Sequence, residues 1–230
     1  MRSSTATRLD NPVWHALEGP HRAFGEGDRL ARRFDPEVAP FAALPDAVAP
    51  ESWDALRTLA GPGRVVALFR RDLPAREGWE VAVRMPCHQM VCDRLREHPE
   101  AGGVAPLGPS DVADMRALVE RTQPGPFFGR THELGRFLGV REQGELIAMA
   151  GERLRIDGAT EISAVCTDPR HRRRGLAAAL VAAAATAVHA RGETAFLHVL
   201  HDNTAAIRVY AALGFATRAD IDVVGLRAPR

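Results

Sequence analysis

A cluster of basic residues between a strand-like run and an alanine-rich run is the feature of this sequence most suited to chemistry. Residues 170–174 contain four arginines, and Gly175 opens an Ala- and Leu-rich segment, residues 176–190, that favours a helix. The preceding strand must end at Asp168 and Pro169, because proline cannot continue a ladder of main-chain hydrogen bonds. A helix that starts here presents free N–H groups and the positive end of its dipole. We therefore expect a phosphate or pyrophosphate to bind at this turn.

A second motif follows near the end of the chain. Residues 203–215 match the pattern N-x-x-A-x-x-x-Y-x-x-L-G-F, and residues 172–177 match R-x-x-G-x-A. With both motifs in this order, the chain resembles the GNAT superfamily, the acetyl-CoA-dependent N-acetyltransferases, over about residues 103–226. The resemblance implies an α/β (α+β) fold, in which helices flank a mixed and twisted sheet, and it implies acetyl-CoA as the acyl donor.

The resemblance also implies roles for individual residues. The turn and the helix start would hold the CoA pyrophosphate, and the strand before them would offer main-chain groups to the pantetheine arm. Asn203 would lie near this arm, and Tyr210, the only tyrosine of the chain, would protonate the departing CoA thiolate. The residues expected at the cofactor are Val165, Cys166, Thr167, Arg172, Arg173, Arg174, Gly175, Leu176, Ala177, Asn203, Ala206 and Tyr210.

Arg173 departs from the family pattern, because many members have glycine at this position. A left-handed conformation is unfavourable for arginine, so we expect the turn to differ locally. Two other interpretations compete with these roles. The arginine cluster alone would also fit a solvated surface turn, and Tyr210 would also fit a helix residue that packs through its ring.

Acetylation of an amine needs a base, because an ammonium group cannot attack a thioester before it loses a proton. Asp157 and Gly158 predict a two-residue hairpin, which would pair Leu154 with Glu161 and Glu152 with Ser163. This register places Glu152 and Glu161 diagonally on one face of the sheet. Their repulsion would raise one carboxyl pKa, so we expect one of them to be the catalytic base, directly or through water. The alternative is that both are solvated hairpin residues.

Other polar residues could contribute to the acceptor site. His132 and Glu133 fall in a Pro- and Gly-rich break, where the family often covers the acceptor, and they are candidates for the substrate pocket. His198 and His201 lie near the end of a strand that would face the cleft. We expect a pocket or proton-transfer role for His198, although simple loop or core positions would also explain these residues.

The cysteines predict neither a metal site nor a disulfide framework. Cys87, His88 and Cys92 lack the C-x-x-C spacing of metal ligands, and no second pair exists, so we expect no metal. Cys166 has the side-chain parity opposite to its strand neighbours and is expected to be packed rather than nucleophilic. An odd number of cysteines, three, without a signal-like run after Met1, favours a reduced and cytoplasmic protein.

The order of predicted elements suggests two units, residues 1–98 and 99–230. The first is expected to be a small α+β accessory domain, either unrelated to the second or a degenerate copy of part of it. The second is expected to be the GNAT-like domain. Helices are predicted at 12–17, 50–60, 111–121, 176–190 and 204–213, and strands at 65–69, 79–83, 104–107, 135–140, 145–156, 161–167, 196–200, 215–217 and 221–226.

Composition and charge limit the partners. The formal net charge is +1 and the chain has no lysine, so a nucleic-acid-binding protein, normally strongly basic, is disfavoured. No apolar run approaches the roughly 20 residues of a membrane-spanning helix. The leading hypothesis is transfer of an acetyl group to a primary amine of a small molecule or peptide by direct attack. The alternative is a sensor that binds acetyl-CoA without turnover. The first hundred residues would shape the acceptor pocket, form a homodimer surface or stabilise the second unit.

Overall fold

The computed structural model describes residues 3–74, 76–98 and 102–230. The helices are α1 (Ser3–Arg8), α2 (Pro12–Glu18), α3 (Pro50–Ala60), α4 (Val112–Thr122), α5 (Leu176–Ala190) and α6 (Thr204–Leu213), with short 3-10 turns η1 (Arg22–Phe24), η2 (Pro109–Asp111), η3 (Thr131–Leu134) and η4 (Pro169–His171). The strands are β1 (Gly25–Gly27), β2 (Arg32–Phe34), β3 (Ala42–Ala43), β4 (Val65–Arg70), β5 (Glu80–Cys92), β6 (Val104–Leu107), β7 (Phe137–Glu142), β8 (Glu145–Ile156), β9 (Ala159–Thr167), β10 (Thr194–Leu200) and β11 (Ala216–Arg227).

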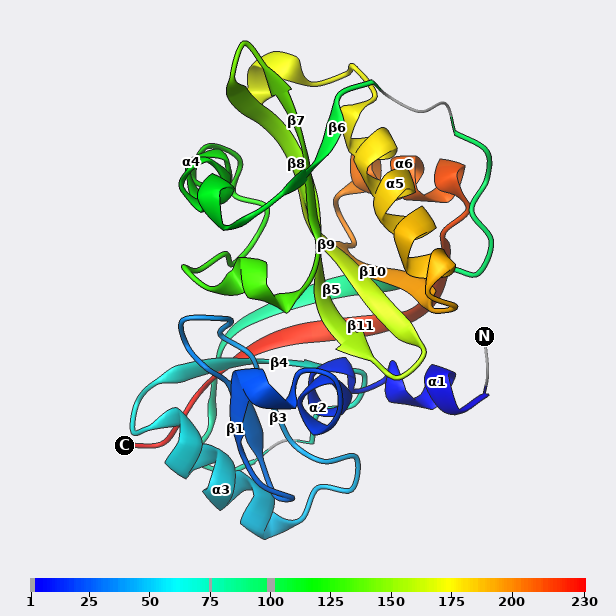
Figure 1. Ribbon diagram of the computed structural model, residues 1–230. Helices are drawn as coiled ribbons and strands as arrows, with labels where there is room; N and C mark the ends of the chain where they lie inside the picture. Colours follow the sequence, from blue (N-terminus) through cyan, green and yellow to red (C-terminus); the bar gives the residue numbers. More distant parts are fainter. Residues whose placement is uncertain (1–2, 75, 99–101) are drawn as a thin grey trace.

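An eight-stranded mixed sheet forms the centre of the molecule, in the order β4-β11-β5-β10-β9-β8-β7-β6 (Figure 1). β9 and β10 pair in parallel, whereas the other neighbours in this order pair antiparallel. A second, three-stranded sheet is formed by β1, β2 and β3. The predicted fold class, a mixed sheet flanked by helices, is therefore confirmed.

Helices cover both faces of the large sheet. α5 and α6 lie on one side and α4 on the other (Figure 1). Val181 of α5 belongs to the buried cluster that contains Ile162 and Leu197, whereas Met115 of α4 packs in a cluster with Met149. Cys166 lies in this second cluster, as its strand parity predicted. Among the described residues, no helix is long and apolar enough to cross a membrane.

The large sheet continues across the boundary that the sequence predicts between residues 98 and 99. β5 is far longer than the predicted strand at 79–83, and it lies between β10 and β11. One buried cluster joins Leu17 and Phe34 to Leu154 and Phe196. The first hundred residues thus share a sheet and a core with the rest, because β5 pairs with β10 on one side and with β11 on the other. Residues 99–101 of the predicted linker lie outside the described residues.

The helix boundaries follow local sequence signals. Pro50 occupies the first helical position of α3, and Gly61, with φ of 84°, ends this helix as predicted. Asn203 precedes α6 and its side chain accepts a hydrogen bond from the Ala206 N–H at 3.2 Å. Gly214, with φ of 103°, ends α6. The two caps therefore fix where α6, the helix of the second motif, begins and ends.

Gly151 in β8 is expected to resist substitution. A Cβ atom at this position would lie 2.1 Å from the Cε1 atom of Phe137, which is buried under α4. Gly151→Ala should therefore lower the free energy of unfolding by about 1–3 kcal/mol through overpacking. Urea unfolding measures this loss. Gly108→Ala is the matched control, because nothing lies within 4 Å of its Cβ position, and equal stability of the two variants would contradict the prediction.

Candidate functional site

The large sheet opens between β9 and β10. These strands pair only where Ala159, Thr160 and Glu161 face residues 194–196. Beyond this point β9 pairs with β8 as far as Thr167, and β10 pairs with β5 as far as Leu200. Their facing edges are therefore unpaired among the described strands, and both present main-chain donors and acceptors. The sequence predicted that Val165 and Thr167 offer such groups, but it gave no sign of the opening itself.

A local kink accompanies the opening. Ala164 in β9 has φ of 52°, which is uncommon for a residue with a side chain. Such a conformation turns the strand locally, as in a β-bulge, and these features often occur beside active sites. Ala164 lies two residues after the buried Ile162 and just before the predicted pantetheine-binding stretch. No pattern in the sequence marks Ala164, because alanine is not a residue type that favours positive φ.

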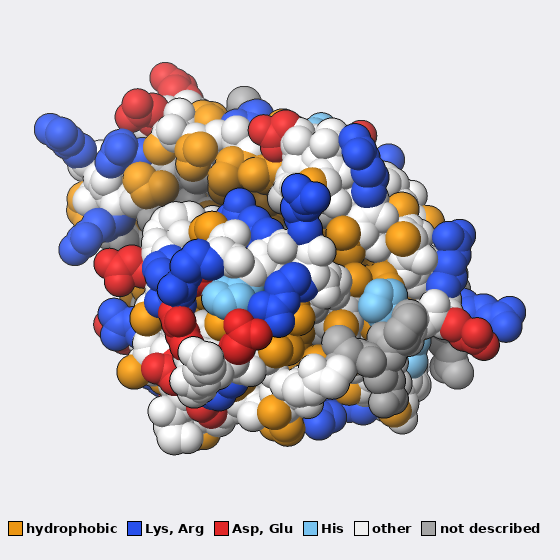
Figure 2. Space-filling view, turned by 90° about the horizontal axis from the view of Figure 1, so that it is seen from above, with side chains coloured by type: hydrophobic (Ala, Val, Ile, Leu, Met, Phe, Trp, Pro, Cys, Tyr) orange, Lys and Arg blue, Asp and Glu red, His pale blue; other side chains and the backbone are white. Residues whose placement is uncertain are grey.

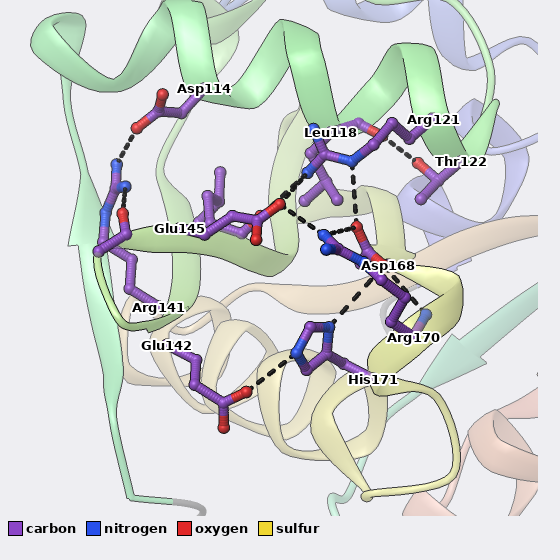
Figure 3. Close-up of polar contacts among 12 residues, drawn as sticks. Asp114, Leu118, Arg121, Thr122, Arg141, Glu142, Glu145, Asp168, Arg170 and His171 are labelled. Atoms are coloured by element: carbon purple, nitrogen blue, oxygen red, sulfur yellow. Dashed lines mark hydrogen bonds and ion pairs between the residues drawn. The ribbon is translucent and has the colours of Figure 1, made fainter.

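The turn after β9 is organised by a buried carboxylate. Asp168 is 1% exposed and accepts hydrogen bonds from the main-chain N–H of Arg170 and from Arg121 Nε, both at 3.0 Å (Figure 3). The side-chain and main-chain hydrogen bonds from Arg170 hold the pKa of Asp168 well below its usual range, and Arg121 adds to this effect. Asp168 therefore stays ionised and fixes the turn. From the sequence, Asp168 was predicted only to end the strand.

Two of the four clustered arginines are already paired. Arg170 Nη2 lies 2.6 Å from Glu145 Oε1, and Arg174 Nη2 lies 2.8 Å from Glu142 Oε1. Arg172 and Arg173 form no ion pair with any residue in the described part of the chain. Seen from above, the end of the molecule that carries η4 shows basic side chains gathered among acidic ones (Figure 2). The charge left for an external anion comes from Arg172 and Arg173.

The backbone of the turn adopts the conformation that the sequence disfavoured. Arg173 has φ of 65°, so the predicted departure from the left-handed region is wrong. Gly175, with φ of 76°, precedes the first residue of α5. Left-handed residues in a turn direct main-chain N–H groups into one concave surface that suits anions. Together with the first N–H groups of α5, at Leu176 and Ala177, the turn can hold a phosphate.

Tyr210 of α6 is buried on the face of the large sheet that α5 and α6 cover. It belongs to the same buried cluster as Ile162 of β9 and Leu197 of β10, and its ring packs on Phe215 at 6.1 Å between centroids. Burial raises the pKa of Tyr210 to about 12, so its hydroxyl keeps its proton at neutral pH. A proton donor needs this state. Asn203, which precedes the same helix, uses its side-chain oxygen to cap Ala206.

The two predicted catalytic glutamates lie on opposite faces of the sheet. The hairpin starts as predicted, with Ile156 opposite Ala159, but a register shift then places Glu152 opposite Ile162 instead of Ser163. Because side chains alternate along β9, Glu161 faces the other way from Ile162 and Glu152. The expected shared face is therefore wrong. The reason is a β-bulge, which adds a residue to β8 between Glu152 and Arg155.

Each glutamate has its own cationic partner. Glu152 Oε1 accepts a hydrogen bond from Arg191 Nη1 at 2.9 Å, beside the end of α5. Glu161 is fully buried and accepts two from Arg153, at 2.6 and 2.8 Å. Burial raises the pKa of Glu161, but Arg153 and a hydrogen bond with His198 outweigh it and lower the pKa to about 2. The predicted increase in pKa through mutual repulsion does not occur.

A buried chain of hydrogen bonds fixes the proton on His198. Arg218 Nη1 donates to Gln89 Oε1 at 2.9 Å, so the Gln89 amide nitrogen faces His198 Nε2, 3.0 Å away. Nε2 therefore accepts, and Nδ1 donates to Glu161 Oε1 at 2.7 Å. His198 lies on β10 beyond its last pairing with β9. This geometry brings Glu161 and His198 together at the opening. Gln89, which orients the imidazole, carried no signal in the sequence.

The predicted pocket residues His132 and Glu133 lie in η3, which docks on the N-terminal region. Glu133 forms a bidentate pair with Arg130, at 2.9 and 3.0 Å, and Arg130 also pairs with Asp35 at 2.8 Å. His132 Nδ1 contacts the Gly129 carbonyl at 3.2 Å. These contacts hold the break after α4 in place, and a pocket role for the two residues stays a prediction.

The chain matches a family model and several solved structures. The family model described as FR47-like protein matches residues 137–223. The solved structure of a GNAT-family protein from Novosphingobium aromaticivorans is 37% identical and superimposes with a TM-score of 0.87 over 96% of this chain and 99% of that one. This match includes the first hundred residues, in which the sequence showed no resemblance.

More distant solved structures share the fold. A GCN5-related N-acetyltransferase from Kribbella flavida is 22% identical, with a TM-score of 0.68 over 98% of this chain and 96% of that chain. A GCN5-related N-acetyltransferase-like protein from Streptococcus suis is 14% identical, with a TM-score of 0.53 over 97% of both chains. The comparison with curated proteins gives no significant match. Full-length similarity at 37% identity, to a relative with this same fold, shows that the chain belongs to the GNAT family of acetyltransferases.

Proposed function

We propose that this protein transfers an acetyl group from acetyl-CoA to a primary amine of a small molecule or peptide. The observation that carries the proposal is the opening between β9 and β10, which ends at a turn able to hold an anion. The unpaired strand edges suit the amide-containing pantetheine arm, and Arg172, Arg173 and the start of α5 suit its pyrophosphate. One linear ligand with an anionic end would satisfy both features.

The chemistry is a direct displacement at the thioester. The amine nitrogen forms a bond to the carbonyl carbon, and the carbon–sulfur bond breaks. The Tyr210 hydroxyl, protonated at neutral pH, gives its proton to the departing sulfur. Main-chain N–H groups on the open edge of β9 stabilise the charge that develops on the carbonyl oxygen. Positioning of the amine and the thioester supplies much of the remaining rate.

The proton leaving the amine goes to His198, with Glu161 as its positioning partner. The lone pair of the imidazole lies on Nε2, which Gln89 now contacts, so this contact must give way when the proton arrives. Glu161 holds Nδ1 at 2.7 Å and stays ionised, so it stabilises the imidazolium that forms. Glu152 lies on the other face and is left out of the proton transfer.

A second candidate function is the binding of acetyl-CoA without turnover. The observation in its favour is that both glutamates are held in ion pairs, so neither is a free carboxylate base. Assays of thiol release with acetyl-CoA across an amine library separate the two functions. Release that depends on an amine supports the transferase. Binding of acetyl-CoA with no release on any amine supports the second candidate.

Tyr210→Phe tests the proton donor. We expect kcat to fall by about 10²–10⁴-fold, the usual contribution of a general acid, while KM for acetyl-CoA changes little. Phenylalanine keeps the packing of the ring on Phe215, so the variant should fold like the wild type. The measurement is thiol release at saturating amine. An unchanged kcat would remove Tyr210 from the mechanism.

His198→Gln tests the proton acceptor. We expect kcat/KM for the amine to fall by about 10²–10⁴-fold and the shape of its pH profile to change, because the proton acceptor is gone. Glu152→Gln is the comparison variant and should keep the wild-type pH profile. Glu161→Gln is less suitable, because the charge of Arg153 would stay buried without a partner, at a cost of about 3–5 kcal/mol. If the pH profile changed in Glu152→Gln but not in His198→Gln, the proton acceptor would be Glu152 instead of His198.

Arg172→Gln tests the anion site. The side chain forms no ion pair with the described residues, so its loss should leave the fold intact while it raises KM for acetyl-CoA by about tenfold, the effect of losing one charge-assisted contact of about 1.4 kcal/mol. Initial rates at varied acetyl-CoA measure this change. Arg57→Gln in α3 removes an equal charge far along the chain and should leave KM unaltered. Equal KM values for the two variants would argue against a pyrophosphate at the turn.

A further inference from the structure

Three residues that the acetyl-transfer chemistry does not use converge on neighbouring elements of the sheet. His88 lies on β5, Asp220 on β11, and His201 directly after β10. His88 Nδ1 lies 2.8 Å from Asp220 Oδ1, and His201 Nε2 lies 3.1 Å from the same oxygen. The two imidazole rings are 4.0 Å apart between centroids. All three ligand atoms lie within 4.8 Å of one another.

The backbone holds these side chains together. His88 and Asp220 are directly opposite each other in the β5–β11 ladder. The main-chain N–H of His201 donates to the Pro86 carbonyl at 3.1 Å, which fixes the segment after β10 against β5. The cluster therefore does not depend on a mobile loop. Cys87, next to His88, points to the buried core instead, so the sequence-level grouping of Cys87, His88 and Cys92 is not the one that forms.

The spacing of the ligand atoms suits a metal ion. A Zn²⁺ ion bound at about 2.1 Å by tetrahedral ligands separates neighbouring ligand atoms by about 3.4 Å. His88 Nδ1 and His201 Nε2 lie 2.8 and 3.1 Å from Asp220 Oδ1, so small side-chain rotations would open the cluster to this spacing. Two imidazole nitrogens and one carboxylate oxygen form a ligand set of the kind found in zinc sites that keep open positions. Asp220 is 70% exposed at its side chain, so water can complete the coordination.

The local charge also favours a cation. Asp202 follows His201 directly, and Asp222 lies two residues beyond Asp220 on the same strand face. Arg84 pairs with Asp222, and Arg70 lies opposite Asp222 in the β4–β11 ladder. Asp220 and Asp202 therefore place carboxylates beside the two imidazoles. An exposed group of this sign attracts divalent cations before any coordination bond forms.

We propose that His88, His201 and Asp220 bind one divalent transition-metal ion, for which Zn²⁺ is the probe, with water in the remaining positions. The site goes beyond the proposed acetyl transfer and revises the expectation of no metal. A bound ion would join β5, β11 and the segment that leads from β10 to Asn203. It would thereby stiffen the end of one wall of the opening between β9 and β10.

Zinc titration of the untagged full chain tests the proposal. Isothermal calorimetry and equilibrium dialysis should show one Zn²⁺ per chain, and Asp220→Asn and His201→Gln should each lower the affinity by at least tenfold. His15→Asn is the matched control. His15 also lies near two carboxylates, Asp46 at 3.2 Å and Glu18 at 3.6 Å, but has no second histidine there, so its loss should leave the affinity unchanged.

Cobalt gives an independent readout of coordination. Co²⁺ bound by the cluster should produce visible absorption that is absent in His88→Gln, a variant whose folding is checked by circular dichroism. If the wild type takes up no Zn²⁺ at micromolar concentration, or if His88→Gln and Asp220→Asn bind as tightly as the wild type, the proposal is overturned. In that case the cluster is a carboxylate that accepts hydrogen bonds from two histidines.

Discussion

The parting of β9 and β10 leaves two strand edges without partners in the sheet, and such main-chain groups cost free energy wherever water cannot reach them. The fold tolerates the opening because every other edge around it is satisfied. β8 pairs with β9 along its far side, and β5 pairs with β10 along its far side. The open edges are therefore available to a ligand without loss of the sheet. A ligand that supplies amide groups restores the missing hydrogen bonds.

The pairing of the far edge of β10 depends on the first hundred residues. β5 reaches the centre of the sheet from the N-terminal half, and it is bonded on both sides over residues 87–91. The Arg153–Glu161 pair couples the same two regions, because the Arg153 guanidinium lies 5.0 Å from the Phe41 ring and 5.1 Å from the Phe69 ring. These rings cover a charge that would otherwise face an apolar core. The N-terminal region is thus part of the structure that orients His198 and Glu161.

Sequence reasoning succeeded where the signal is local. Asn203 and Gly214 delimit α6, and Asp157-Gly158 forms the predicted hairpin, because caps and tight turns depend on a few adjacent residues. It failed where the cause is distant. The bulge in β8 brings Arg153 onto Glu161, a contact that no pattern of alternation encodes, and one extra residue moved Glu152 to the other face. Strand order is equally non-local, so the central place of β5 was missed.

The four arginines of the turn divide into two pairs with different tasks, and the division follows from charge balance. Four unpaired cations within five residues would repel one another and would hold the turn in no single conformation. Glu142 and Glu145 compensate two of these charges through ion pairs. Both glutamates lie in the β7–β8 hairpin, which is fixed in the sheet. Such exposed pairs contribute only about 0–1 kcal/mol each to stability, so their main effect is on position. Arg173, in a left-handed conformation, lies next to Arg172 in the turn, and neither forms an ion pair with the described residues, as the proposed anion site requires.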